Sequence, residues 1–229
     1  MLFLVADTSG RQGAVGLVRA GEGADPSGIK VLDEVALLGG TFSAELIPQI
    51  AALLGKHGFT KRDIDAFIVV SGPGSFTGLR VGLAGVKALA EILQKPIVPV
   101  SLLEVLALAA ACEGKVCAAI DAGRGEVYAG EYRVVNELTQ RENERLLPVA
   151  DFLSAAAGSS VVTTHESLAA TARNAGLPVV LIASIKAEMI ARLGWRKLRA
   201  AETVTPEGLE ANYIRRTDAE ILAKQAQIS

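Results

Sequence analysis

The sequence feature that most constrains the fold is a short apolar run followed by a glycine-rich loop and a long helical pattern. Residues 67–70 are apolar and rich in β-branched side chains, which is typical of a buried strand. Residues 71–78 contain three glycines, which permit backbone angles that other residues resist. We expect Thr77 to cap a helix that continues to about Gln94, where Lys95 and Pro96 end it. A strand, a tight loop and a helix in this order predict an α/β architecture.

The predicted helix is apolar around most of its circumference, so we expect it to be covered on more than one side. One face carries leucine, valine and alanine at helical spacing and should meet the sheet. Beside it, Gly78, Gly82 and Gly85 form a stripe with almost no side chain. Each helical glycine costs about 1 kcal/mol relative to alanine. The stripe therefore predicts a second surface that approaches closely, and another chain can supply that surface.

The composition indicates one large domain or two small ones. The chain has 229 residues, of which 50% are hydrophobic but only 4% aromatic, so its core must consist mainly of aliphatic side chains and alanine. The net charge of −2 gives no overall attraction to nucleic acid. The apolar residues 1–6 are too few for a signal peptide and no other segment is long enough to span a bilayer, so we expect a cytoplasmic protein without membrane contact. Cys112 and Cys117 are expected to be core residues rather than a disulfide or half a metal site.

Periodicity and turn residues predict two consecutive α/β units. In the first, the order β-β-β-α-β-α predicts three antiparallel strands followed by parallel ones, with strands at 2–6, 13–18, 31–38 and 67–70 and the first helix at 44–56. In the second, the predicted strands are 97–100, 116–120, 126–135, 160–163 and 179–182, and the predicted helices are 102–111, 151–157, 166–175 and 184–200. Residues 136–145 are charged and expected to be exposed, and residues 218–227 are expected to form a last polar helix.

An aspartate next to the turn of a strand–turn–strand unit occurs twice, at Asp7 and at Asp121. This repetition indicates two related lobes. We expect an N-terminal lobe over residues 1–103, completed by the C-terminal helix at about 208–229, and a C-terminal lobe over residues 104–207.

The glycine-rich loop matches neither of two common phosphate-binding loops. A P-loop ends in Gly-Lys-Ser/Thr, whereas Gly78 is followed by Leu79 and Arg80. The dinucleotide motif is G-x-G-x-x-G, and the run from Gly72 through Gly74 to Gly78 is one residue too long. A strand–loop–helix still offers free amides to an anion. Two interpretations therefore remain, weak anion binding and a tight turn that docks a helix.

Two aspartate turns carry residue types that suit a magnesium–nucleotide site. The first places a carboxylate beside two hydroxyls at the end of a strand, and the second combines a carboxylate with an arginine. The same residue types are more often explained by an Asx turn, in which the side chain binds backbone amides. The candidate nucleotide-binding residues are Asp7, Thr8, Ser9, Gly72, Gly74, Asp121 and Arg124.

The inventory of catalytic side chains is small. His57 and His165 form no His-x-x-x-His pair and have no recognisable serine or cysteine partner, so we expect no catalytic residue and no metal site. The basic residues between Arg192 and Arg199 are interpreted as the charged outer face of a helix rather than as an RNA contact.

Three segments of the chain resemble the bacterial TsaB (YeaZ) family: Leu4 to Ser9, the run Gly72-Pro-Gly-Ser-Phe-Thr-Gly-Leu-Arg80, and Ala119 to Tyr128. The second run is highly specific, and with Tyr213 to Arg215 the matches extend over nearly the whole chain. The resemblance implies an actin-like, Hsp70-like ATPase (ASKHA) fold of two RNase H-like lobes, with mixed sheets flanked by helices.

The function that the resemblance implies is that of a non-catalytic subunit in the synthesis of N6-threonylcarbamoyladenosine (t6A) at position 37 of tRNAs that read ANN codons. By resemblance, the chain binds a catalytic paralogue, TsaD, and TsaE, an ATPase, joins the pair, while TsaC-type enzymes supply the threonylcarbamoyl-adenylate. This subunit is expected to need no cofactor, with weak binding of ATP or ADP and Mg²⁺ at the complex left open, and to meet tRNA through the complex. The implied interface helix covers residues 78–94, and the expected interface residues are Phe76, Thr77, Gly78, Val81, Gly82, Gly85 and Leu89.

One departure and two alternatives accompany the resemblance. Phe42-Ser43 stands where the family often has His-Ser, so a role of that histidine is not carried over. A stand-alone ATP-dependent enzyme on the same fold, a small-molecule kinase or ATPase, would use Asp7 and Asp121; a metallopeptidase is disfavoured by the lack of paired histidines. Without a partner, an uncovered apolar helix face should self-associate, so we expect a homodimer through the same surface.

Overall fold

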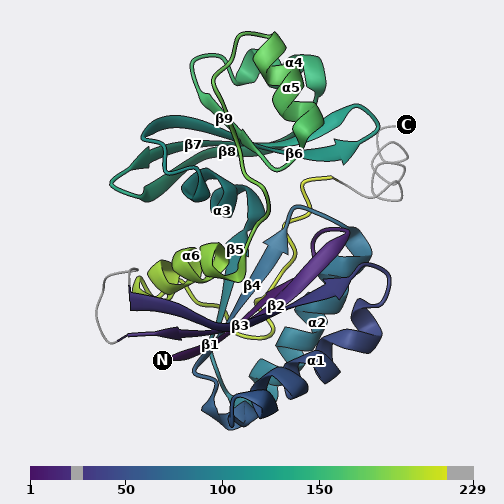
Figure 1. Cartoon of the computed structure of the whole chain (residues 1–229), viewed down its shortest axis with the longest axis vertical. Coiled ribbons are helices and arrows are strands. Elements are labelled where there is room, and N and C mark those ends of the chain that lie inside the picture. The colour runs from purple at the N-terminus through teal and green to yellow at the C-terminus, as the bar shows by residue number, and fades with distance from the viewer. Residues whose placement is uncertain (22–27, 216–229) are drawn as a thin grey trace, which may run out of the picture.

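The computed structural model of the chain, which describes residues 1–21 and 28–215, has two lobes, each built on a five-stranded mixed sheet (Figure 1). The helix expected at residues 218–227 lies outside the described residues. Of the C-terminal segment expected to complete the N-terminal lobe as a helix at about 208–229, residues 208–215 are described; they form no helix, but Leu209 joins the core of that lobe. None of the helices within the described ranges is long and apolar enough to cross a membrane.

The first sheet has the predicted arrangement of antiparallel and then parallel strands. Its order is β3-β2-β1-β4-β5, where β1 pairs with β2 in the antiparallel and with β4 in the parallel sense. The five strands are β1 (Leu2–Asp7), β2 (Gln12–Ala20), β3 (Ile29–Leu38), β4 (Ala66–Gly72) and β5 (Ile97–Ser101). Every residue of β4 is buried, because helices cover both faces of this sheet.

Two helices, α1 (Phe42–Lys56) and α2 (Phe76–Leu93), pack on one face of the first sheet (Figure 1). The helix α2 is confirmed, but the prediction of its N-cap residue was wrong. Ser75, rather than Thr77, is the N-cap residue, since its hydroxyl accepts a hydrogen bond of 3.3 Å from the amide of Gly78. A short 3₁₀ helix, η2 (Lys61–Asp63), precedes β4.

The second sheet contains one strand that the sequence did not predict. Its order is β10-β9-β6-β7-β8, formed by β6 (Gly114–Gly123), β7 (Glu126–Val135), β8 (Leu138–Pro148), β9 (Ser160–Thr163) and β10 (Val179–Leu181). The expectation that residues 136–145 form only an exposed charged segment was incomplete, because most of them belong to the edge strand β8. The helices α4 (Val149–Ala155) and α5 (Glu166–Asn174) cover the outer face of this sheet, and α3 (Leu102–Ala109) covers the inner face.

The two sheets share one topology, which confirms the two related lobes. In each, an antiparallel hairpin of the first two strands is followed by a third antiparallel strand, and the last two strands add in parallel on the other side of the first. The strands β1 and β6 occupy the same central position. Asp7 ends β1 and Asp121 lies near the end of β6, so the two aspartate turns are equivalent.

The helices α3 and α6 (Ala187–Arg199) lie between the two sheets (Figure 1). The expected division at residue 103 differs from the structure in one respect, because α6 packs on the first sheet. Trp195 contacts Phe3 of β1 with ring centroids 5.5 Å apart, and Ile190 joins the same core. The residues of α6 therefore complete the first lobe, although they follow the second lobe in sequence.

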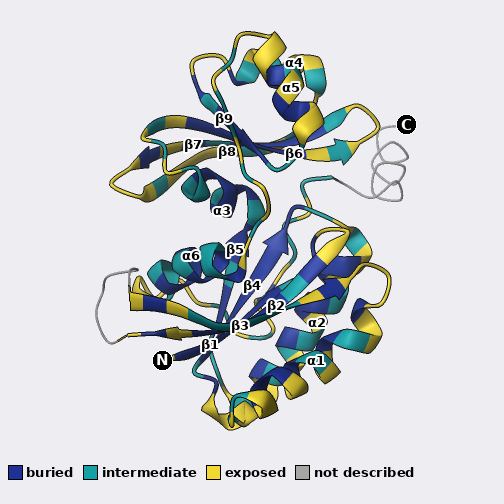
Figure 2. Cartoon of the chain, viewed as in Figure 1, coloured by how far each residue is buried: buried dark blue, intermediate teal, exposed yellow. Residues whose placement is uncertain are grey.

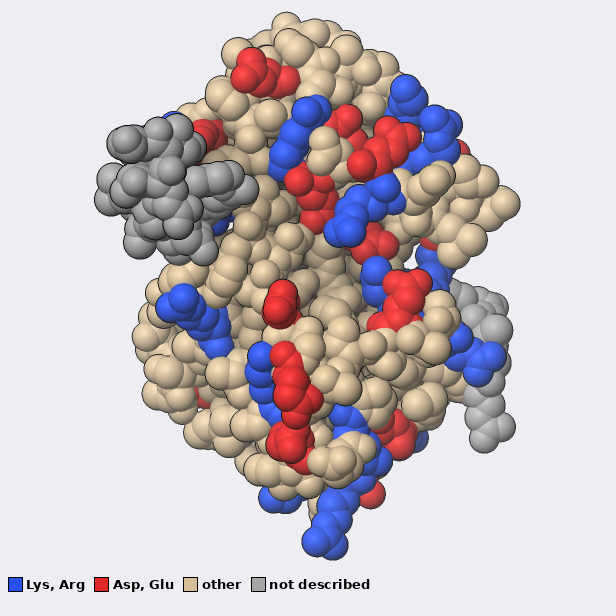
Figure 3. Space-filling model, turned by 180° about the vertical axis from the view of Figure 1, so that it is seen from behind, with Lys and Arg blue, Asp and Glu red and all other residues tan. Residues whose placement is uncertain are grey.

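Three of the four cations in the basic cluster on α6, Arg192, Arg196 and Lys197, are paired with acidic side chains of the same chain. Arg192 lies 2.8 Å from Glu188, and Lys197 lies 3.1 Å from Glu104. Seen from behind, acidic and basic side chains lie next to one another on the surface of the molecule (Figure 3). The pairing favours the interpretation of a charged helix face over that of an RNA contact.

Candidate functional site

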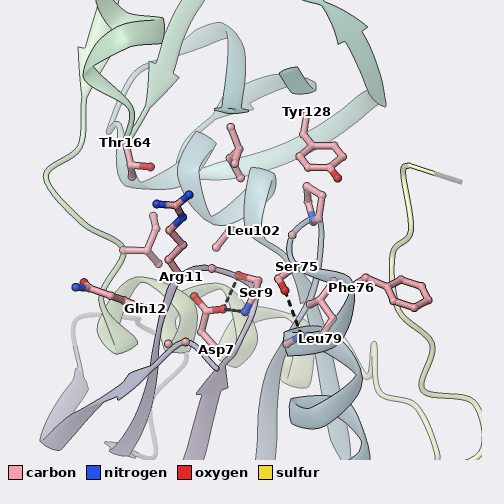
Figure 4. A pocket seen from close by; sticks show the side chains of 18 of the residues that line it. Asp7, Ser9, Arg11, Gln12, Ser75, Phe76, Leu79, Leu102, Tyr128 and Thr164 are labelled. Carbon is pink, nitrogen blue, oxygen red and sulfur yellow. Dashed lines mark hydrogen bonds between the residues drawn. The ribbon is translucent and has the colours of Figure 1, made fainter. Parts of the chain in front are cut away.

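The candidate site is a cleft between the lobes with a volume of about 1850 Å³. The turn after β1, the loop before α2, the turn after β6 and residues 183–186 contribute to its walls. Figure 4 shows how side chains from both lobes face this space. Of the candidate nucleotide-binding residues, the lining includes Asp7, Ser9, Gly74, Asp121 and Arg124.

The two aspartates at the cleft are both held in Asx turns. Asp7 Oδ1 accepts hydrogen bonds from the amide of Ser9 at 2.8 Å and from its hydroxyl at 2.6 Å (Figure 4). Burial raises the pKa of Asp7 above its ordinary value, and the two bonds from Ser9 oppose that shift. Asp121 Oδ1 accepts a bond of 2.8 Å from the amide of Gly123. Each turn uses one carboxylate oxygen among the described contacts, so the second oxygen remains available to a ligand.

The glycine-rich loop packs closely on the first aspartate turn. The amide of Ser75 donates a hydrogen bond of 2.6 Å to the carbonyl of Ser9. A Cβ at Gly74 would collide with that same carbonyl group. Because Ser75 gives its amide to the protein itself, the geometry supports the interpretation of a tight turn that docks a helix.

Two of the seven candidate nucleotide-binding residues do not line the cleft. The hydroxyl of Thr8 is buried and donates a hydrogen bond of 2.8 Å to the carbonyl of Gly78. Gly72 has a φ of 133° and faces the segment after α6, where a Cβ would lie 2.7 Å from the carbonyl oxygen of Asn212. Both residues were therefore wrong as ligand contacts, because each holds parts of the fold together.

Three cations at the cleft have no carboxylate partner in the described part of the chain: Arg11, Arg124 and Lys186. Arg11 extends from the first lobe toward the second, where Thr164 lies (Figure 4). Arg124 belongs to the turn of the second lobe. Cations on both walls suit an anion such as the phosphates of a nucleotide. The described residues contain no group of three or more His, Cys, Asp or Glu side chains placed to hold a metal ion.

The glycine stripe of α2 is covered by the chain itself, which contradicts the reasoning behind the expected interface. A Cβ at Gly82 would collide with the hydroxyl of Thr8, and one at Gly78 would collide with the carbonyl of that residue. At Gly85, a Cβ would lie 2.8 Å from Leu46 Cδ2 of α1. The close approach that three glycines predict is therefore real, but it occurs between α2 and its own lobe.

The other expected interface residues have mixed positions. Thr77 is exposed, while Val81 and Leu89 are partly buried against the first core. The ring of Phe76 is covered by the guanidinium group of Arg80 at 3.7 Å and by Tyr213, with ring centroids 4.9 Å apart. Phe42, at the position where the resembled family often has histidine, is buried with its ring near Gly13 and Gly78.

An outer face of α1 and α2 is exposed (Figure 2), and most of the exposed residues on it are apolar. Ile47 on α1 and Ile92 on α2 are 46% and 69% exposed. We call this surface the α1–α2 face; its other exposed members are Ala44, Pro48, Ala51 and Ala52 on α1 and Ala84 and Ala88 on α2. The sequence contained evidence for the α1–α2 face, since α2 has apolar residues on the side away from the core. The interface was instead predicted at the glycine stripe, which lies on a different side of α2.

Two lobes of one topology that face each other across a cleft, with an aspartate turn at the same place in each, define the actin-like ATPase (ASKHA) class of folds. Residues 39–193 match the family model described as "TsaD: tRNA N6-adenosine threonylcarbamoyltransferase". The solved structure "YeaZ from Pseudomonas aeruginosa" superposes with a TM-score of 0.73 and 26% identity, covering 93% of this chain and 99% of that one. The chain belongs to the TsaB (YeaZ) family, within the wider group that the family model describes.

Curated relatives support the same assignment over part of their length. The "tRNA threonylcarbamoyladenosine biosynthesis protein TsaB" of Bacillus subtilis (strain 168) is 32% identical over 142 residues, which are 62% of this chain and 59% of that protein. The protein of the same name from Escherichia coli (strain K12) is 38% identical over 91 residues, which are 38% of this chain and 39% of that protein. The matched part of the chain thus spans less than two thirds of each of these relatives.

Proposed function

We propose that this chain is a non-catalytic subunit in the synthesis of t6A at position 37 of tRNA, and that it acts by binding a TsaD-type catalytic paralogue. Membership of the TsaB (YeaZ) family is the observation that carries this proposal, since curated relatives are named as t6A biosynthesis proteins. A role without catalysis of its own fits the cleft, where each aspartate gives one carboxylate oxygen to a turn of the fold. Within the described part of the chain, no contact in the cleft favours a stand-alone kinase or ATPase over this role.

The α1–α2 face is the surface that we assign to the paralogue. Its alanines allow another helix pair to approach closely, and its two exposed isoleucines can serve as apolar anchors. Fully burying one such side chain contributes about 1.5–3 kcal/mol. The face continues from α1 to α2, because Ile47 Cδ1 lies within 3.8 Å of a Cβ placed on Gly85. The α1–α2 face therefore replaces the glycine stripe as the proposed interface. Val81 and Leu89 lie at the border of this face.

The remaining partners follow from the same proposal. A TsaE-type ATPase joins the pair, and tRNA is met through the complex. Without the paralogue, the α1–α2 face pairs with a second copy of the chain, because an apolar helix surface is stabilised by leaving water. The cleft, with cations on both walls, is assigned at most weak binding of ATP or ADP, with Asp7 and Asp121 as the carboxylates that would face a Mg²⁺ ion.

The test is co-purification with the paralogue followed by a t6A assay on tRNA. Ala88→Arg places a bulky cation on the α1–α2 face at an exposed position and should abolish both the complex and the modification. Ala170→Arg, at an exposed alanine of α5, is the matched control and should leave both unchanged. Gly82→Arg is unsuitable, because it would disrupt the packing of α2 on Thr8 within the chain. Full complex formation by Ala88→Arg would contradict the assignment of the face, and absence of binding by the unaltered chain would contradict the proposed function.

Sedimentation equilibrium of the unaltered chain and Ala88→Arg tests the pairing of copies. A dimer that becomes a monomer in the variant is expected, and a monomer at high concentration in both would refute it.

A further inference from the structure

The carboxylate of Glu144 on β8 is buried and has several partners. Its side chain is only 5% exposed. Oε1 accepts hydrogen bonds from the hydroxyls of Tyr132 and, at 2.5 Å, of Ser101. Oε2 accepts a bond of 2.6 Å from the side-chain amide of Asn212, with Arg141 at 3.7 Å. A buried carboxylate is stable only when such donors replace water, so this contact set is a built feature of the fold.

The donors to Glu144 come from three separate parts of the chain. Ser101 ends β5 in the first sheet, and Tyr132 lies on β7 in the second sheet. Asn212 belongs to the segment that follows α6. Burial and the adjacent Glu144 raise the pKa of Tyr132 above its ordinary value, so its hydroxyl remains a donor. One carboxylate therefore joins both sheets and a third segment.

That third segment crosses from one lobe to the other, and we call residues 208–215 the strap. Leu209 is 1% exposed in the first core, and the amide of Asn212 donates a 2.8 Å bond to the carbonyl of Ser71. Ile214 then packs against the core of the second lobe, and Arg215 lies 2.6 Å from Glu126 of β7. The strap is thus anchored in both lobes, with Asn212 at its midpoint.

A second set of polar contacts ties the lobes on the same side of the second sheet. Glu104 of α3 accepts a hydrogen bond of 2.6 Å from Thr139 of β8 and lies 3.1 Å from Lys197 of α6. Arg196 of α6 pairs with Glu137, in the turn between β7 and β8. Apolar packing continues through this region as well, because Leu102 contacts the cores of both lobes.

Lobes that each have their own sheet and core move relative to one another by default, unless their interface holds them. We propose that Glu144 and the strap hold the two lobes of this chain in one relative orientation, so that the cleft does not open and close. The strap also carries Tyr213, which contacts Phe76 and Arg80 at the start of α2. The fixed orientation consequently extends to the helix that forms part of the α1–α2 face.

Distances between spin labels on the two lobes test the proposal in the full-length chain. Nitroxides are attached at Lys61→Cys in the first lobe and Ala170→Cys in the second, both exposed, in a Cys112→Ser, Cys117→Ala background. The unaltered Glu144 should give one narrow distance distribution, and Glu144→Ala should broaden or shift it. Glu142→Ala, which removes a 45% exposed carboxylate from the same strand, is the matched control and should leave the distribution narrow. A broad distribution with Glu144 present, or a narrow unshifted one in Glu144→Ala, would overturn the proposal.

Glu144→Gln provides a second test that does not depend on how well the alanine variant folds. Glutamine retains one acceptor oxygen for the two hydroxyls but carries no charge and has an NH2 group in place of Oε2, so the charge-assisted contacts of Oε2 with Asn212 of the strap and with Arg141 are lost. Hydrogen exchange at the backbone amide of Asn212 should then become about tenfold faster, while exchange at the backbone amides within β4 stays unchanged. Equal exchange of Asn212 in both proteins would show that Glu144 does not hold the strap.

Discussion

Adding one methyl group at Gly82 tests whether α2 is packed by its own lobe. The substitution Gly82→Ala has two opposing effects. Alanine in a helix interior is favoured over glycine by about 1 kcal/mol. The new Cβ, however, collides with the hydroxyl of Thr8, which is buried and bound to the carbonyl of Gly78 at 2.8 Å. Overpacking of this kind costs about 1–3 kcal/mol, so the net change should be a destabilisation of up to about 2 kcal/mol.

The chain offers a matched control, Gly55→Ala, and a second substitution, Thr8→Ala, that should reverse the sign of the stability change caused by Gly82→Ala. Gly55, in the helix α1, has open space where a Cβ would lie, so Gly55→Ala should stabilise the protein by about 0.5–1 kcal/mol. In a Thr8→Ala background, the colliding hydroxyl is absent and only the Cβ of that residue remains, at 3.2 Å. Gly82→Ala should then be neutral or stabilising, with a coupling of about 1–3 kcal/mol between the two sites.

The measurement is the free energy of unfolding in urea for the four proteins of this cycle and for Gly55→Ala. If Gly82→Ala stabilises the otherwise unaltered chain as much as Gly55→Ala does, the stripe is not in contact with Thr8. The original expectation of a bare glycine surface for a partner would then regain its basis.

Three further predictions concern ionisable groups. Hydrogen bonds from its two basic neighbours lower the pKa of Asp33 to about 2, so its stabilising contribution is present above pH 4 and lost as the pH falls toward 2; in Asp33→Asn, the melting temperature should fall less over this range. Burial raises the pKa of Asp7, which disfavours its charged form at neutral pH. Asp7→Asn should therefore keep the Asx turn and raise the melting temperature at pH 7. A large decrease in the melting temperature would show that the charge of Asp7 is needed. Burial raises the pKa of Cys117 to about 12, so in the native protein at pH 8 a thiol reagent should modify Cys112 far faster, and equal rates would contradict the burial.

Much of the fold could be predicted from the sequence, because strands and helices buried on a defined face leave a periodic pattern. The strand β8 could not, since an edge strand pairs on one side only and its charged side chains remove the alternation. The placement of α6 was also hidden. The apolar stripe of α6 indicates that the helix packs on a sheet, but no residue near α6 in sequence indicates that Trp195 packs on the first sheet rather than the second.

Five of the seven candidate nucleotide-binding residues line the cleft, but their geometry could be predicted only in part. Asp7 and Asp121 were located correctly at equivalent turns of the two lobes. Thr8 lies beside Asp7 in sequence, but alternation along the chain directs its hydroxyl to α2 rather than to the cleft. The glycines of α2 correctly predicted a close contact, yet sequence alone cannot tell whether the contacting surface belongs to the same chain. Glu144 was missed because its partners come together only in the folded chain.

The late position of α6 affects how the protein is made. Phe3, Val5 and Ile68 lie on the side of the first sheet that α6 covers, and the ribosome must complete the whole second lobe before that cover exists. Until then, a nascent chain presents an uncovered apolar sheet, which is the kind of surface that aggregates or recruits chaperones. The N-terminal lobe is therefore not an independent folding unit, and a fragment that stops before Ala187 should be insoluble even though it contains every strand of the first sheet.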